Sequence, residues 1–257
     1  MAYTSRLLSF DSDVLNAFRG IIASGDIYTY WGIPLTSSPK PWKHSIADRA
    51  SFLFAGGLMW NGRNVPPKGE KLRRRGGFPT WSWTSLVDQI TMCPPPQGRE
   101  RVVDATFPRF YVQDGSKLTP IRELLERALE SSCLAIPEHG PSIVVEGRIA
   151  EVYLIPTDSA LYYEVYAHAL LMESSLRKVH GGARIDGDDP DVLSRIDHQP
   201  WQAVELMPYD EFRTWMLIDI HGQSARRIGM FMQEPAIEDG VSITLDLPTR
   251  DMTIRIE

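Results

Sequence analysis

The 257-residue sequence predicts an α+β fold, with early helices packed on a mainly antiparallel sheet or a sandwich-like second half. Three amphipathic helical patterns precede residue 132, and alternating apolar residues dominate after residue 142. The composition, 43% hydrophobic and 23% charged, is that of an ordinary globular protein. We expect a helical and aromatic-strand subdomain at 1–135 and a mainly antiparallel β subdomain at 136–257, joined in one continuous core.

The first helix is predicted to begin at Asp11, whose carboxylate suits the N-cap position. Phe10 should pack on Leu15 as a hydrophobic staple. Apolar residues then recur at helical spacing as far as Ile22, and Gly25 ends the segment.

Two further helices carry start signals. Ser45 begins the second, where Asp48 completes a capping box, and Gly56-Gly57 allows a neighbouring element to approach closely. Thr119 caps the third, with Pro120 at the first helical position. The buried face of the third helix should consist of Ile121, Leu124, Leu125, Ala128 and Leu129.

Between these two helices the pattern changes to that of strands. Residues 78–85 alternate aromatic and small hydroxyl side chains, which predicts a half-buried strand with Trp81 and Trp83 on the same face. Asp114-Gly115 predicts a type I′ turn in a hairpin within residues 108–118.

Strands dominate the second half. The apolar phase changes after Ile149, so we expect a bulge near Ala150-Glu151. Residues 161–172 suit either a helix or a strand, whereas 178–200 have no apolar period and should form a mobile loop. Further strands are expected at 201–207, 215–220, 228–232, 241–247 and 252–256.

The charge balance and the cysteine count limit the functional class. A net charge of −6 argues against a nucleic-acid partner. The cationic run Arg73-Arg74-Arg75 is typical of a solvated loop, with a phosphate or acidic partner as the alternative. Cys93 and Cys133 suggest neither a disulfide framework nor a zinc site. Without a signal segment or a membrane-spanning run, we expect a soluble, cytoplasmic protein with no membrane partner.

The sequence contains no standard catalytic signature. Phosphate-binding glycine loops, H-E-x-x-H and C-x-x-C are all absent. The acidic run at 186–191 is interrupted by Pro190 and is better explained as a solvated loop than as a calcium site. The six histidines are scattered, and only His168 is a candidate for facing a pocket. We predict no metal and no cofactor, and name no catalytic residue.

Trp81 and Trp83 allow two interpretations. Two rings on one strand face could form a platform for a ligand or an arginine, beside Arg74 and Arg75. The interpretation we favour is that both anchor the core, since each indole needs only one partner for its N–H.

Several segments, in order along the chain, resemble the region that follows the HET domain in fungal heterokaryon-incompatibility proteins. The segments are D-S-D-V-L-N-A-F at 11–18, Y-W-G-I-P-L at 30–35, F-L-F-A-G-G-L-M-W at 52–60, R-R-G-G-F-P-T-W-S-W-T at 74–84, W-M-L-I-D-I at 215–220 and R-I-G-M at 227–230. The resemblance covers about residues 3–232. The HET domain itself has no counterpart in the sequence.

The resemblance implies a non-catalytic recognition or regulatory module, of the kind associated with fungal non-self recognition, and it transfers no site residue. The partner would be a protein or a small apolar ligand. The alternative is a stand-alone enzyme of secondary metabolism, such as a cyclase, isomerase or lyase, which needs only an apolar pocket and a few acids or bases. An inert fragment of a gene is a third, weaker explanation.

Overall fold

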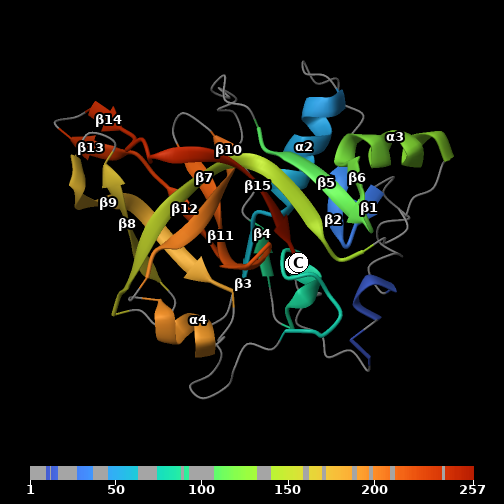
Figure 1. Cartoon of the computed structure of the whole chain (residues 1–257), viewed down its shortest axis with the longest axis horizontal. Helices are drawn as coiled ribbons and strands as arrows, with labels where there is room; N and C mark the ends of the chain where they lie inside the picture. Colours follow the sequence, from blue (N-terminus) through green and yellow to red (C-terminus); the bar gives the residue numbers. More distant parts are fainter. Residues whose placement is uncertain are drawn as a thin grey trace.

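Figure 1 shows the computed structural model of the chain. The structure describes residues 10–11, 13–16, 28–36, 46–62, 74–87, 90–92, 107–131, 140–158, 162–169, 172–186, 190–196, 199–208, 212–238 and 241–257.

The described chain consists mainly of strands, with few helices, so the α+β prediction is broadly correct. The helices are α2 (Ile46–Gly57), α3 (Ile121–Ser131), α4 (Pro190–Arg195) and the 3-10 helix η1 (Trp83–Ser85). The main sheet contains β5 (Arg109–Asp114), β6 (Lys117–Pro120), β7 (Ile143–Pro156), β8 (Tyr163–Ala169), β9 (Met172–Ile185), β10 (Trp201–Pro208), β11 (Arg213–His221), β12 (Ser224–Gln233) and β15 (Thr249–Ile256). Three two-stranded sheets pair β1 (Tyr28–Tyr30) with β2 (Ile33–Thr36), β3 (Trp60–Gly62) with β4 (Ile90–Met92), and β13 (Ala236–Glu238) with β14 (Val241–Ile243).

Six strands of the main sheet form a closed ring of hydrogen-bonded neighbours. The order is β7, β8, β9, β12, β11 and β10, and β10 pairs again with β7, so every neighbouring pair in the ring is antiparallel. Outside this ring, β15 runs antiparallel to β7 and parallel to β12. The hairpin β5–β6 extends the sheet from β7, so strands from the first half of the chain join those of the second.

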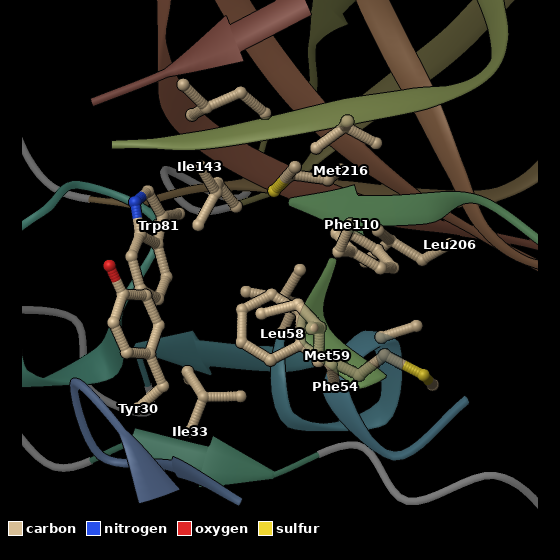
Figure 2. Packing of buried hydrophobic residues seen from close by; sticks show 14 of the residues in the cluster. Tyr30, Ile33, Phe54, Leu58, Met59, Trp81, Phe110, Ile143, Leu206 and Met216 are labelled. Atoms are coloured by element: carbon tan, nitrogen blue, oxygen red, sulfur yellow. The ribbon is translucent and has the colours of Figure 1, made fainter. Parts of the chain in front are cut away.

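Alternate residues of the six ring strands fill the interior of the ring. This cluster includes Ala150, Val152 and Leu154 of β7, and it is joined by Val192 of α4 and by Ile196, which follows that helix. A second cluster lies between the outer face of the sheet and the early elements α2, α3, β1 and β2. Figure 2 shows part of this outer core, where Tyr30 and Trp81 lie close to one another and Phe54 lies beside Leu58 and Met59.

The phase change along β7 arises from these two cores and not from a bulge. Val145 and Ile149 point into the outer core, whereas Ala150, Val152 and Leu154 point into the ring. The register with β10 is unbroken from 149 to 152. The predicted bulge is therefore wrong. The strand stays regular, and one face is buried in the outer core while the opposite face is buried in the ring.

Only the start of the first predicted helix is described, at residues 13–16. Val14 and Leu15 are buried as expected, but Phe10 is 69% exposed, so the predicted staple between Phe10 and Leu15 does not form. The structure does not describe Ile22, Gly25 or the predicted cap Ser45. It does not describe the side chain of Asp48, the expected partner of Ser45, either.

The predictions for α2 and α3 hold in most respects, but Pro120, expected at the first helical position, is the last residue of β6, and α3 begins at Ile121. A Cβ atom on Gly57 would overlap Ile33 Cγ2 of β2, so this glycine allows the close approach that was expected. The α3 residues predicted to be apolar and inward are buried except Leu129, which is 49% exposed. Leu129 follows the buried Ala128 and lies at the edge of the face that the other four residues form.

Two local predictions in the aromatic region need correction. Residues 78–85 form turns and η1 instead of a strand, and Ser82 caps η1 by accepting a hydrogen bond from the Thr84 backbone N–H. In the β5–β6 hairpin, Asp114 pairs with Lys117, so Gly115 and Ser116 form the turn. Gly115 has φ +58° while Ser116 has no positive φ, which excludes type I′ and agrees with type II′.

Most of residues 178–200 have regular structure, so the predicted mobile loop is wrong. β9 continues to Ile185, pairing with β12 through Gly181, Gly182 and Ala183, and α4 follows at Pro190–Arg195. Asp186, expected in a solvated acidic run, is 3% exposed and forms an ion pair with Arg227. Gly181 and Gly182 are exposed and separate the buried Val179 from the buried Ala183, which explains the missing apolar period.

Candidate functional site

Trp81 and Trp83 both belong to the outer core. They are 0% and 4% exposed, and their indole N–H groups donate to the backbone oxygens of Pro141 and Gly32 at 2.9 Å. Tyr30 stacks on Trp81, with ring centroids 5.7 Å apart. The core interpretation is confirmed, because burial leaves neither indole open as a binding platform.

Arg74 and Arg75 fasten this aromatic turn to the rest of the molecule. Arg75 is 4% exposed and donates to the backbone oxygens of Thr84 and Leu86, so it does not belong to a solvated loop. Arg74 is half-buried and donates to the backbone oxygens of Asp186 and Arg227, at 3.0 and 3.3 Å. Both guanidinium groups are therefore engaged in holding the fold.

His168 lies on a solvent-facing area of the ring that we call the tyrosine face. Its members point away from the ring interior: Glu151, Tyr153 and Ile155 of β7, Glu164, Tyr166 and His168 of β8, and Leu176 and Lys178 of β9. In Figure 1, β8 and β9 lie at the opposite end of the molecule from α2 and α3. The outer core therefore leaves this area uncovered.

Hydrogen bonds and ring contacts order the tyrosine face. Tyr153 and Tyr166 are cross-strand partners. His168 meets Tyr153 edge to face, with centroids 5.7 Å apart and Nε2 3.5 Å from the tyrosine oxygen. Each tyrosine hydroxyl donates to a carboxylate two residues earlier, that of Glu151 at 3.3 Å and that of Glu164 at 2.9 Å. The two phenol rings are thus held in place while parts of them remain exposed.

The carboxylates alter the acidity of these groups. Burial, followed by the charge of Glu151, raises the pKa of Tyr153. The hydrogen bond to Glu164 raises the pKa of Tyr166. Lys178 lies 2.5 Å from Glu164, and this hydrogen bond lowers the pKa of the carboxyl. At neutral pH both tyrosines are therefore hydrogen-bond donors rather than phenolates.

Inside one end of the ring lies a buried acid, Glu205 of β10. It is 3% exposed and directly opposite Trp215 of β11. Glu205 Oε2 is 3.0 Å from Arg148, and Arg213 lies on its other side. Burial raises the pKa of Glu205 against the opposing effect of these two arginines. A carboxyl of this kind is suited to proton transfer.

At the other end, Asp219 of β11 accepts hydrogen bonds from three side chains, those of two arginines and one histidine. Arg195 of α4 donates at 2.7 Å, His221 at 2.8 Å and Arg226 at 3.1 Å. Burial would raise the pKa of Asp219, but these hydrogen bonds outweigh it and hold the pKa below its ordinary value. The cluster attaches α4 to the end of the ring.

Of these residues only His168 was expected at a site from the sequence; Tyr153, Tyr166, Glu205 and Asp219 were not. The odd-numbered residues 151, 153 and 155 were the available signal, because they alternate with the apolar residues of β7. No sequence signal pointed to Glu205, since one acid among apolar neighbours is ordinary near the end of a strand.

Among the described residues, no group of three or more His, Cys, Asp or Glu side chains could hold a metal ion. In the same part of the chain, every helix is too short or too polar to cross a membrane. Cys93 and Cys133 lie outside the described ranges. No family model, no curated protein and no solved structure matches the chain.

Proposed function

We propose that the protein is a non-catalytic recognition or regulatory module that binds a protein partner through the tyrosine face. The observation that carries this proposal is the ordered, partly exposed pair Tyr153 and Tyr166. Tyrosine supplies a large contact area with little conformational freedom to lose, which is why it is enriched where proteins bind one another. Ile155 and Leu176, 43% and 44% exposed, add apolar area at the sides of the pair.

The likeness to the region after the HET domain supports the same role. It suggests a cytoplasmic module in fungal non-self recognition, in which binding a partner is the output. The net charge of −6 favours a protein partner over a nucleic acid.

A pull-down with three baits tests this proposal. The baits are the unaltered protein, the double variant Tyr153→Ala/Tyr166→Ala, and the control Tyr111→Ala on β5. A partner retained by the unaltered protein and the control, but bound at least tenfold more weakly by the double variant in titrations with purified partner, supports the proposal. A partner bound equally by all three, or no partner at all, contradicts it.

A second candidate function, a stand-alone enzyme acting on an apolar small molecule, is favoured by Glu205. A buried acid beside Trp215 could donate or accept a proton in a cyclase, isomerase or lyase reaction. The test is mass spectrometry of a metabolite extract incubated with the protein and with Glu205→Gln. A compound consumed by the protein and spared by the variant supports catalysis, and identical extracts contradict it.

A further inference from the structure

The end of the ring that holds Glu205 contains two buried polar atoms that lack hydrogen bonds. Glu205 Oε1 lies 3.7 Å from Arg213 Nε, which is an ion-pair contact but too long for a hydrogen bond. Neither Glu205 Oε1 nor Arg213 Nη1 has a hydrogen-bond partner among the described residues. A buried acceptor and a buried donor on two neighbouring side chains are costly unless something bridges them.

The remaining bonds of the cluster are satisfied and fix its geometry. Arg148 is 3.0 Å from Glu205 Oε2 and donates through Nε to Thr249 Oγ1 at 3.0 Å. Arg213 donates through Nη2 to Asp246 Oδ1 at 2.9 Å. The arginine side chains are 29% and 14% exposed, so solvent reaches the rim of the cluster.

Residues 244–248, between β14 and β15, contribute apolar side chains beside the cluster. Leu247 is buried with the interior of the ring and Leu245 packs partly against it. The Leu245 backbone oxygen accepts from Gln233, and the Asp246 carboxylate accepts from Arg213. Gln233 also accepts from the Trp215 indole at 3.2 Å. Apolar side chains and an indole therefore stand beside the unsatisfied polar atoms.

The charges select the kind of group that fits. Arg148 and Arg213 carry two positive charges, and Glu205 and Asp246 carry two negative charges when ionised. Because these cancel, an added anion or cation would leave a net charge in a largely buried place. A neutral group that both donates and accepts a hydrogen bond meets the requirements of Glu205 Oε1 and Arg213 Nη1.

We propose that this end of the ring is a binding site for a small neutral ligand with an apolar body and a primary amide or hydroxyl group, which donates to Glu205 Oε1 and accepts from Arg213 Nη1. The site is separate from the tyrosine face and does not depend on it. It would provide the ligand contact that the second candidate function needs, yet it stands as a binding site without any turnover.

Benzamide, with benzoate as its charged counterpart, tests the site by protein-observed NMR, with the Trp215 indole N–H as reporter. We expect benzamide to bind at least tenfold more tightly than benzoate. In Glu205→Gln the lost negative charge should reverse this order, so that benzoate binds more tightly. Glu126→Gln, at an exposed position of α3, should keep the order of the unaltered protein.

Arg213→Lys provides a second variant if Glu205→Gln does not fold. It retains the positive charge facing Asp246 but removes Nη1, and should weaken benzamide at least tenfold. Equal binding of benzamide and benzoate to the unaltered protein overturns the proposal, as does an unchanged order in Glu205→Gln. A crystal structure soaked with benzamide in which only a water bridges the two atoms also overturns it.

Discussion

The guanidinium carbon of Arg227 lies 3.6 Å from the centroid of the Trp60 ring. The same side chain is fully buried, pairs with Asp186 at 2.5 Å, and donates to the backbone oxygens of Leu58 and Trp60. One residue of β12 thus joins the ring to the end of α2 and the start of β3. The sequence offered no hint of this junction beyond the adjacent Arg226 and Arg227 in a largely apolar strand.

Arg227→Ala should therefore be among the most destabilising single changes in the described chain. The substitution leaves the Asp186 carboxylate buried without its cation. We therefore expect the free energy of unfolding to fall by about 3–5 kcal/mol. Urea unfolding measures this change. Arg250→Ala, which removes an exposed side chain at 3.4 Å from Gln202, should change the same quantity by less than about 0.5 kcal/mol. Similar losses in the two variants would contradict the role of Arg227.

Trp83→Ala tests the assignment of the aromatic turn to the outer core. Removing this buried indole and its hydrogen bond to Gly32 should destabilise the protein by about 3–5 kcal/mol. Tyr166→Ala, on the tyrosine face, is the matched aromatic control and should cost far less. Thermal melting compares them, and an unchanged melting temperature in Trp83→Ala would refute the assignment.

The adjacent glycines of α2 should respond in opposite directions to the same change. In Gly57→Ala the new methyl group overlaps Ile33, so we expect destabilisation despite the better helix propensity of alanine. In Gly56→Ala the methyl group meets only Met207 Cε, at 3.6 Å, so the variant should gain up to about 1 kcal/mol. Chemical denaturation measures the change in the free energy of unfolding of each variant. Changes of the same sign in both variants would contradict the close approach at Gly57.

Asp219 should make stability depend on pH in the acid range. Its pKa is lower in the folded protein than its ordinary value of 3.8, so its contribution is full above that value and is lost as the pH falls through the lowered pKa. Asp219→Asn should thus lose about 1–2 kcal/mol at pH 7, and the difference should shrink in strong acid. Asp251→Asn, at an exposed position of β15, is the control. A difference that stays constant with pH would exclude the linkage.

Glu151 should affect the titration of Tyr153 across the tyrosine face. Because the charge of Glu151 is the second cause of the raised pKa, after burial, Glu151→Gln should bring the pKa of Tyr153 part of the way back to 10.0. Ultraviolet or NMR titration of the phenol measures the shift. Glu146→Gln, beside Tyr111 on β5, should leave Tyr153 unchanged.

The apolar pattern of the sequence predicted those elements in which each face packs on the same core along its whole length. α3 has a clear period because it packs one face on one core, and β11 was predicted from its unbroken apolar run because each of its two faces is buried in one of the two cores. β9 was missed because Gly181 and Gly182 interrupt the apolar alternation between Val179 and Ala183, and a Cβ atom at Gly181 would overlap the Met232 backbone oxygen. That requirement comes from β12, which lies about fifty residues away in the sequence.

The site could be predicted only in part for a similar reason. Trp81 and Trp83 resembled a platform because aromatic residues beside arginines are common in binding sites, but their burial depends on Tyr30 and Gly32 from an earlier segment. His168 was identified by residue type alone. Its partner Tyr153 comes from the neighbouring strand, and only the pairing of β7 with β8 brings the two together.

The long strand β7 has a consequence for how the molecule unfolds. Within fourteen residues it pairs with β5, β8, β10 and β15 and contributes to both apolar clusters. A slip of its register by one residue would exchange the side chains of both clusters at once. The ring and the helical layer should therefore melt in a single cooperative transition, and amides in the middle of β7 should exchange with solvent only through global unfolding.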